Sequence, residues 1–117
     1  MTLHKLHLHQ QPFDKVQNGQ KTIEARLFDE RRQRIEIGDE IDFINRADES
    51  LCRVKVHRLH RAPTFQELFT LCGPTEFGAE SVEDAVKSIE KYYDYDEQLR
   101  YGVIGIEFVT ERTPSRK

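Results

Sequence analysis

The segment NGQKTIEARL, residues 18–27, concentrates polar side chains that could bind or act on a ligand. If residues 21–27 form a strand, Glu24 and Arg26 lie on one face, with their Cα atoms roughly 6–7 Å apart. An adjacent arginine keeps the carboxylate ionised, and the carboxylate fixes the plane of the guanidinium. A fixed guanidinium suits a phosphate, a carboxylate or the edge of a base.

Lys21 directly follows a turn at Gly19. Strict alternation would place Lys21 on the apolar face with Ile23, but alternation often fails at the first residue of a strand. Lys21 could then reach the mouth of a cleft and donate to an anion, or act as a base if burial favours its neutral form. The alternative is an ordinary solvated strand face, on which a pair between Glu24 and Arg26 contributes about 0–1 kcal/mol.

The composition limits the classes of function. The chain has 117 residues, of which 37% are hydrophobic and 33% charged, as in a folded domain. The net charge of -3 excludes a strongly basic nucleic-acid binder, so any such binding must come from a local patch. Cys52 and Cys72 are far apart, which favours reduced thiols. Without a signal-peptide pattern or a membrane-spanning run, we expect a cytoplasmic protein with no membrane partner.

Hydrophobic patterning predicts the elements that must position these residues. Strands are predicted where apolar residues alternate or run together, at residues 3–9, 21–27, 41–43, 51–61 and 103–109. Helices are predicted at residues 12–18, 64–72 and 81–93, the last two with N-caps at Thr64 and Ser81. The polar run at 29–34 is expected to form a loop or one helical turn, and residues 93–102 a loop.

These elements predict one α+β, β-rich domain over residues 1–110, followed by a flexible tail at 111–117. In so short a chain, a curved sheet or small mixed β-barrel hides strand edges economically. We expect five or six strands with two to three peripheral helices.

The order of motifs also carries a family resemblance. LHL is followed by a Pro-Phe helix, GQKTIEARL, IGDEIDF and finally RYGVIGIEF. This order resembles small single-domain members of the ASCH family in the PUA-like superfamily, over residues 3–109. The family motif G-x-K-x-x-E-x-R stands here as Gly19, Lys21, Glu24 and Arg26. The resemblance implies a small β-barrel with a cleft beside the motif, and RNA as a partner.

The resemblance also suggests further ligand-binding residues. Thr22 lies within the motif, and Arg100 and Tyr101 precede the last predicted strand, which would run back near the motif. In that arrangement Arg100 or Tyr101 lines the same cleft. The alternative is a loop-edge anchor in which Tyr101 is half-buried.

Some ASCH members are hydrolases, acting on N4-acetylcytidine or on RNA. In the amidohydrolase subgroup a threonine, thought to be activated by the motif lysine, stands two residues before the motif arginine. Glu24 occupies that position here, and Thr22 lies two residues earlier. The subgroup also uses a second glutamate, for which Glu76 and Glu80 are candidates. A glutamate could act as a general base for water, but it is not the same nucleophile.

Two further groups of polar residues could bind ligands. Arg53, Lys55 and His57 would form a basic ladder on one face of a strand, which could follow a nucleic-acid backbone or simply be solvated. His7 and His9 have a spacing that can bind zinc, but no third ligand is marked. We therefore expect neither a metal nor a cofactor.

Two functions follow from these residues. The first is a binding module whose cleft at Lys21, Glu24 and Arg26 recognises RNA, a nucleotide or a nucleoside. The second is a small hydrolase that uses Lys21 and Glu24 on an N-acylated pyrimidine nucleoside or an RNA phosphodiester. Binding is favoured because Glu24 replaces the family nucleophile, and a monomer is favoured over an oligomer. A structural domain that binds a partner protein is the third alternative.

Overall fold

A computed structural model of the chain describes residues 1–110. The expected tail at residues 111–117 lies outside this described part. The strands are β1 (Leu3–Leu8), β2 (Ile23–Leu27), β3 (Glu40–Asn45), β4 (Leu51–Ala62) and β5 (Val103–Thr110). The α-helices are α1 (Gln10–Gln17), α2 (Phe65–Cys72), α3 (Val82–Ile89) and α4 (Tyr95–Tyr101), and the 3₁₀ helices are η1 (Arg32–Arg34) and η2 (Pro74–Phe77).

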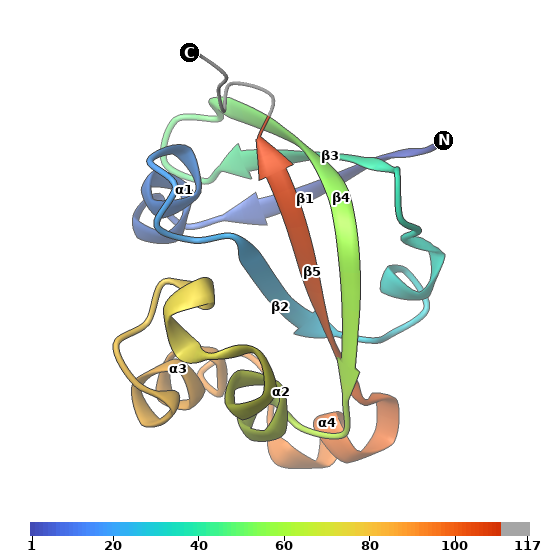
Figure 1. The fold of residues 1–117 in the computed structure, drawn as a ribbon, viewed down its shortest axis with the longest axis vertical. Helices are drawn as coiled ribbons and strands as arrows, with labels where there is room; N and C mark the ends of the chain where they lie inside the picture. Colours follow the sequence, from blue (N-terminus) through green and yellow to red (C-terminus); the bar gives the residue numbers. More distant parts are fainter. Residues whose placement is uncertain (111–117) are drawn as a thin grey trace.

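The strands form one curled sheet in the order β1-β3-β4-β5-β2 (Figure 1). β1 runs parallel to β3, and the other neighbours are antiparallel. The long strand β4 pairs with β3 through its first half and with β5 along most of its length, and its register shifts between Val56 and Arg58. Such an irregularity bends a strand, so the sheet curls into a half-barrel whose edges are β1 and β2. The predicted mixed, β-rich barrel is confirmed, with five strands.

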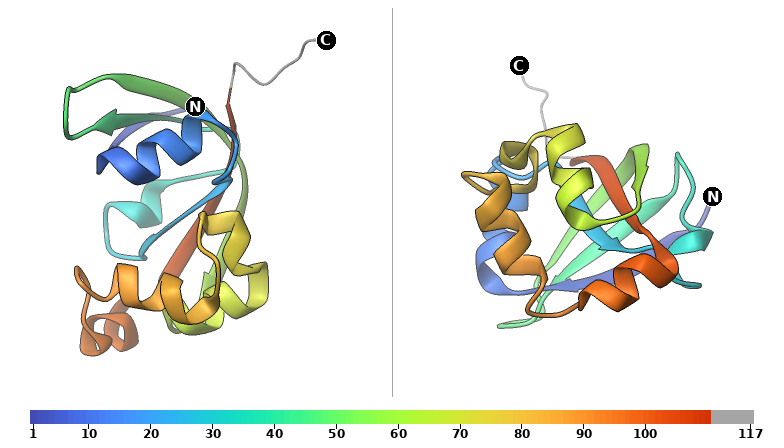
Figure 2. Two further views of the ribbon diagram at one scale, coloured as in Figure 1. Left: turned by 90° about the vertical axis from the view of Figure 1, so that its left-hand side faces the viewer. Right: turned by 90° about the horizontal axis from the view of Figure 1, so that it is seen from below.

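Two hydrophobic clusters hold the sheet. Helix α1 contributes Phe13 and Val16 to the first cluster, together with side chains of β1, β3, β4 and β5. Helix α2 contributes Phe65 and Leu68 to the second, which also contains apolar residues of β2, η2 and α3. Figures 1 and 2 show α1 at one end of the molecule, with α2, α3 and α4 gathered at the other. A cavity lined by residues of α1, β2, η2 and α3 lies between α1 and this second group.

The predicted loop at residues 93–102 is wrong, because most of this segment forms α4. The Asp94 side chain accepts a hydrogen bond from the Glu97 N–H, and the Glu97 side chain accepts one from the Asp94 N–H. Gln98 is 1% exposed and accepts a hydrogen bond from the N–H of Phe65. The residue that α4 buries most deeply is thus a hydrogen-bonded glutamine, so an apolar pattern could not find this helix. The described residues form four α-helices, one more than expected.

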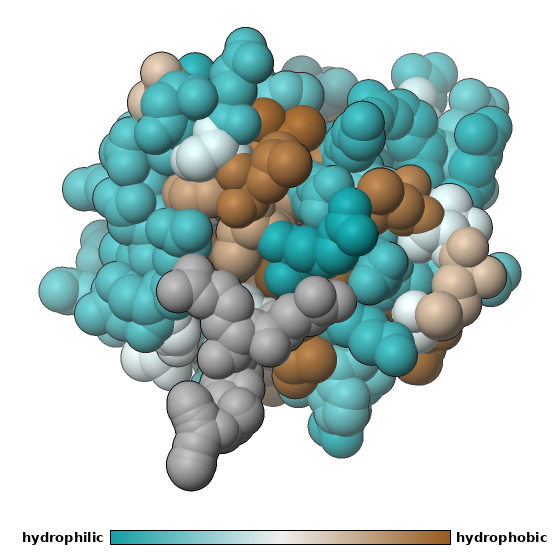
Figure 3. Space-filling model, turned by 90° about the horizontal axis from the view of Figure 1, so that it is seen from above, coloured by the Kyte–Doolittle hydropathy of each residue, from teal (hydrophilic) through white to brown (hydrophobic). Residues whose placement is uncertain are grey.

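The N-caps at Thr64 and Ser81 are confirmed, since each side chain accepts a hydrogen bond from the N–H three residues later. The polar run at 29–34 contains the single helical turn η1. The face in Figure 3 is mainly hydrophilic, with small groups of apolar side chains. None of the helices in residues 1–110 combines the length and apolar character needed to span a bilayer.

Candidate functional site

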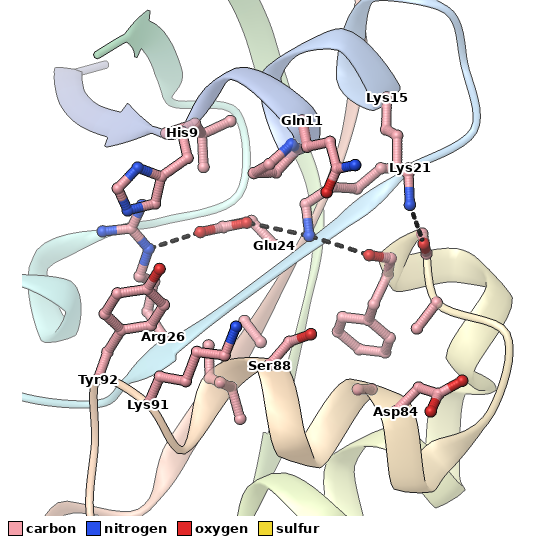
Figure 4. Close-up of a pocket in the computed structure, with 18 of the residues that line it drawn as sticks. His9, Gln11, Lys15, Lys21, Glu24, Arg26, Asp84, Ser88, Lys91 and Tyr92 are labelled. Carbon is pink, nitrogen blue, oxygen red and sulfur yellow. Dashed lines mark hydrogen bonds and ion pairs between the residues drawn. The ribbon is translucent and has the colours of Figure 1, made fainter. Parts of the chain in front are cut away.

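Lys21, Glu24 and Arg26 form an ion triad at the floor of a cleft (Figure 4). The Nζ atom of Lys21 lies 3.1 Å from one Glu24 carboxylate oxygen, and Nε of Arg26 lies 2.6 Å from the other. The side chains of Lys21 and Glu24 are each 8% exposed, and that of Arg26 is 12% exposed. The alternative of a solvated strand face is therefore wrong, because water is largely excluded from all three groups.

The backbone before β2 explains why Lys21 joins the triad. Gly19 has φ +87°, a conformation that glycine adopts without strain, and it lets the chain turn after α1. Lys21 then donates its backbone N–H to the carbonyl of Lys15 at 3.0 Å, so it precedes the strand. Strand alternation does not apply to it, and its Nζ donates to the carbonyl of Phe77 at 3.2 Å. Lys21 thus lies at the floor of the cleft and not at its mouth.

The triad keeps its charges. Burial has the largest single effect on Glu24 and acts to raise its pKa, but the charges and hydrogen bonds of Lys21 and Arg26 together hold this pKa below its ordinary value. Burial acts to lower the pKa of Arg26, whereas Glu24, with a smaller contribution from Tyr93, raises it. Two cations therefore surround one ionised carboxylate, which leaves one net positive charge at the floor of the cleft.

The cleft is an open cavity of about 590 Å³. Its walls come from the end of β1, from α1, β2 and η2, and from α3 with the turn that follows it. Five further basic side chains line it, namely His7, His9, Lys15, Arg46 and Lys91, against two further acidic ones, Glu80 and Asp84. Although the chain as a whole is acidic, basic side chains outnumber acidic ones by seven to three among the residues that line the cleft.

Two flat side chains lie at one end of this cleft. The rings of His9 and Tyr92 stack with centroids 5.7 Å apart and planes 25° from parallel. Figure 4 shows both rings at the end of the cleft where Arg26 lies. Tyr92 is 58% exposed, so one part of its ring remains open to a ligand. Exposed aromatic rings of this kind can stack with a base.

The other motif residues support the triad from outside the cavity. Neither Gly19 nor Thr22 lines the cleft. The Thr22 hydroxyl donates to the Glu76 carboxylate, and its backbone N–H donates to the Glu76 carbonyl at 2.8 Å. Glu76 thus anchors the start of β2 to η2. Of the two candidate glutamates, only Glu80 lines the cavity.

Arg100 and Tyr101 do not line the cleft, contrary to the expectation from the resemblance. Both lie in the last turn of α4, where the Arg100 guanidinium lies 5.8 Å from the ring centre of Tyr101. The strand that follows explains this placement. Val103 pairs with Leu27, the last residue of β2, so the residues before Val103 lie beyond the end of the motif strand.

The basic ladder lies on a different surface. Arg53, Lys55 and His57 are exposed on β4 and alternate with buried residues, as predicted, but none of them lines the cleft. Arg53 makes two hydrogen bonds to the carboxylate of Asp42, of 2.8 and 3.0 Å. One member of the ladder is therefore already paired with a carboxylate of the neighbouring strand β3. His57 lies where the register of β4 shifts.

Sequence reasoning missed most of the cleft wall. In the sequence, His9 stands out only for its zinc-ligand spacing from His7, and no motif marks Lys15, Arg46 or Lys91. These residues come together only because α1 and α3 pack on either side of β2, and no local motif records that packing. Across residues 1–110 there is no group of three or more His, Cys, Asp or Glu side chains that could hold a metal ion.

The chain is similar to known proteins along almost its whole length. The sequence profile of the ASCH domain matches residues 6–111. The crystal structure of the hypothetical protein PH0355 is similar to this chain, with a TM-score of 0.81 and a sequence identity of 30%. The match covers 94% of this chain and 99% of that one. Protein PF0455 from Pyrococcus furiosus is 26% identical, with a TM-score of 0.75, over 95% of this chain and 98% of that one.

More distant structures share the fold alone. An ASCH domain from Lactobacillus crispatus is 9% identical, with a TM-score of 0.65, over 93% of this chain and 79% of that one. No curated protein matches the sequence. The profile match covers nearly the whole described chain, and the curled sheet is shared with ASCH structures. The chain therefore belongs to the ASCH domain family, which has a PUA-like fold.

Proposed function

We propose that the cleft binds a nucleotide unit, either free or within a single-stranded RNA. The observation that carries this proposal is the buried triad of Lys21, Glu24 and Arg26 under an open cavity of about 590 Å³. Its net positive charge suits a phosphate or the oxygen-bearing edge of a base, and the rings of His9 and Tyr92 offer a stacking surface. The volume lies within the usual range of roughly 300–1,000 Å³ for small-molecule pockets.

The triad has donors left for a ligand. A lysine ammonium has three N–H donors, and Lys21 uses two of them among the described residues, on Glu24 and on the carbonyl of Phe77. An arginine has five, and Arg26 uses Nε on Glu24, Nη2 on the carbonyl of His7 and a further contact with the side chain of Tyr93. Because Glu24 fixes both cations, the remaining donors are held in place before a ligand arrives, which lowers the entropic cost of binding.

The same contacts favour binding over hydrolysis. Each carboxylate oxygen of Glu24 faces a cation, and the pKa of Glu24 is lowered because Lys21 and Arg26 outweigh the effect of burial. A general base works best when its pKa lies near the working pH. The pKa of Glu24 is lowered, which takes it further from neutral pH. Lys21 is itself held by Glu24 and by the carbonyl of Phe77.

A titration followed by NMR tests the proposal. The four ribonucleoside monophosphates, the four nucleosides and short single-stranded RNAs are added to the protein, and amide shifts are mapped. We expect shifts around residues 7–9, 21–26 and 88–93, and weaker binding by Lys91→Gln. Lys87→Gln is the matched control, because Lys87 is an exposed lysine on α3 that does not line the cleft.

Two outcomes would contradict the proposal. One is that no ligand of any class shifts the cleft residues. The other is that Lys87→Gln weakens binding as much as Lys91→Gln does, which would reduce the interaction to overall charge. The same samples are assayed for product, and turnover that depends on Lys21 and Glu24 would replace the binding role with the hydrolase.

A further inference from the structure

A second, smaller pocket lies away from the cleft, between the first half of β1 and the 3₁₀ helix η1. Its volume is about 230 Å³. It is lined by the basic side chains His4, Lys5, Arg31, Arg32 and Arg34 and by the apolar side chains Leu3, Leu6 and Ile35. No acidic side chain of residues 1–110 lines it. The three arginines of the segment 29–34 thus all line one cavity.

The nearby carboxylates do not neutralise this group. Asp29 pairs with Nη1 of Arg32 at 2.7 Å, and a carboxylate oxygen of Asp39 lies 2.8 Å from Nε2 of His4. Arg31 and Arg34 are exposed and make no ion pair with any residue of the described chain. The pocket therefore keeps an excess of positive charge from at least two guanidinium groups.

Arg32 provides a second, independent observation. Its Nε is buried and has no hydrogen-bond partner among the described residues, the one side-chain atom of residues 1–110 in this condition. Buried polar groups are nearly always hydrogen-bonded, and an exception calls for an explanation. Arg32 thus lines a cationic pocket with its Nη1 paired to Asp29 and its Nε without an acceptor, and an acceptor from outside the chain would complete its hydrogen bonds.

We propose that this pocket is a second anion-binding site that takes a phosphate group. A phosphate carries up to two negative charges and several acceptor oxygens, so it can satisfy several arginines at once, and guanidinium forks match its geometry. A single carboxylate could satisfy fewer of these donors. The proposal does not depend on the function of the cleft, because no residue lines both cavities.

Strand β1 connects the two sites. His4 lines the phosphate pocket, whereas His7 and His9 line the cleft. At a rise of roughly 3.3 Å per strand residue, three to five residues correspond to about 10–16 Å. The phosphate group could therefore belong to a free small molecule, or to a nucleic-acid strand that also occupies the cleft. Titration with inorganic phosphate and with RNA separates these two sources.

The first arm uses inorganic phosphate at low ionic strength, followed through amide shifts. We expect shifts at residues 3–6 and 31–35, and a loss of affinity of at least tenfold in the double variant Arg31→Gln, Arg34→Gln. The matched control is Arg58→Gln, Lys87→Gln, which removes the same two positive charges from exposed positions outside both pockets. Circular dichroism confirms that each variant is folded. If phosphate shifts no residue of this pocket, or both double variants weaken binding equally, the site does not exist.

The second arm compares a mononucleotide with an RNA octamer. If the phosphate belongs to a strand, the Arg31, Arg34 variant weakens octamer binding and leaves mononucleotide binding in the cleft unchanged. If it belongs to a small molecule, the variant loses inorganic phosphate but binds the octamer as the wild type does. Either result supports the site. If Lys91→Gln loses nucleotide binding in the cleft but still binds phosphate, the two sites are independent, and so are the two proposals.

Discussion

Arg26 reaches across the open side of the half-barrel to His7, with its Nη2 donating to the His7 carbonyl at 2.8 Å. Arg26 lies in β2 and His7 in β1, the two edge strands of the sheet. No strand pairing joins these edges within residues 1–110. A side chain thus makes the connection that backbone ladders make in a closed barrel, and it is the same side chain that fixes Glu24 in the cleft.

We expect Arg26→Lys to loosen this connection. An ammonium group is a compact donor without a planar fork, so a lysine cannot reach both Glu24 and the His7 carbonyl from the place of Arg26. The loss of one buried hydrogen bond to a charged group predicts a decrease of about 1–3 kcal/mol in the free energy of unfolding. Urea denaturation measures this change, and hydrogen exchange should show faster exchange in β1.

Arg58→Lys is the control for this prediction, because Arg58 is exposed on β4 and does not line the cleft. We expect its stability to remain within about 0.5 kcal/mol of the wild type. If Arg26→Lys is as stable as Arg58→Lys and exchanges equally slowly in β1, the connection between the two edges has no energetic role.

We expect Glu24→Gln to be strongly destabilising. The substitution leaves Lys21 and Arg26 buried beside one another without an anion, and breaking a buried ion pair in this way typically costs about 3–5 kcal/mol. Chemical denaturation should show a clear decrease in the midpoint. Glu30→Gln, at an exposed position, should change stability by no more than about 0.5 kcal/mol. If Glu24→Gln is as stable as the wild type, the Glu24 carboxylate does not stabilise the two buried cations.

The stability of the triad should depend on pH in one direction. The pKa of Glu24 in the folded protein lies below its ordinary value of 4.5, because Lys21 and Arg26 outweigh the opposing effect of burial. The unfolded chain therefore takes up this proton first as the pH falls. The contribution of Glu24 is complete above about pH 4.5, and it is lost as the pH falls toward the lower folded pKa.

Denaturation curves between about pH 6 and pH 3 test this direction. Other carboxyls titrate in both proteins, including Asp42, whose pKa is lowered mainly by its hydrogen bonds from Arg53. The difference between wild type and Glu24→Gln therefore isolates Glu24. We expect this difference to shrink on acidification. A difference that stays constant or grows below pH 4.5 would show that Glu24 is not held ionised in the folded state.

Tyr92 and Tyr95 allow a matched test of base stacking. Tyr92 is 58% exposed and lines the cleft, whereas Tyr95 is 56% exposed and does not. Tyr92→Ala should weaken nucleotide binding by about 1–3 kcal/mol, the usual contribution of one stacked base, with little change in thermal stability. Tyr95→Ala should leave affinity unchanged. Equal losses from both variants, or none from Tyr92→Ala, would remove Tyr92 from the binding surface.

The sequence allowed the sheet to be predicted more fully than the site. Each strand can be recognised from its local sequence alone. Ile41 and Phe43 alternate with polar residues, and so do Val54 and Val56. The contact between Glu24 and Arg26 was predictable for the same reason, since both lie two residues apart on one strand. The burial of the pair was not, because β2 is covered on both faces and a strand pattern reports only one apolar face.

The remaining differences have local causes. The resemblance places Arg100 and Tyr101 in the cleft because the last strand is expected to run back near the motif. Val103 pairs instead with Leu27 at the end of β2, and the capping box of Asp94 and Glu97 starts a helix that contains both residues. That box was visible in the sequence as an Asp followed three residues later by a Glu. In contrast, nothing in the sequence joins Tyr92 to His9, because their contact depends on how α1 and α3 are placed by the sheet.

Gly105 in β5 lets α2 pack close to the sheet, beside the cleft. A Cβ atom at this position in β5 would lie 3.2 Å from Leu68 Cδ1 and 3.2 Å from Ile23 Cγ2, which is tighter than most Cβ contacts, so both side chains would have to move slightly. Gly105→Ala should therefore destabilise the protein by about 1–3 kcal/mol through overpacking. The energetic coupling should be visible in the double variant Gly105→Ala, Leu68→Ala, which should lose less stability than the sum of the two single variants.

This packing also bears on ligand binding. Phe69, beside Leu68 in α2, packs edge to face on Phe77 with ring centres 4.7 Å apart, and the Phe77 carbonyl accepts the hydrogen bond from Lys21. A shift of α2 away from β5 should therefore move Phe77 and disturb Lys21. We expect Gly105→Ala to weaken binding in the cleft under conditions in which it remains folded, with amide shift changes at residues 21 and 77. Unchanged amide shifts there, despite a loss of stability, would show that α2 and the triad are independent.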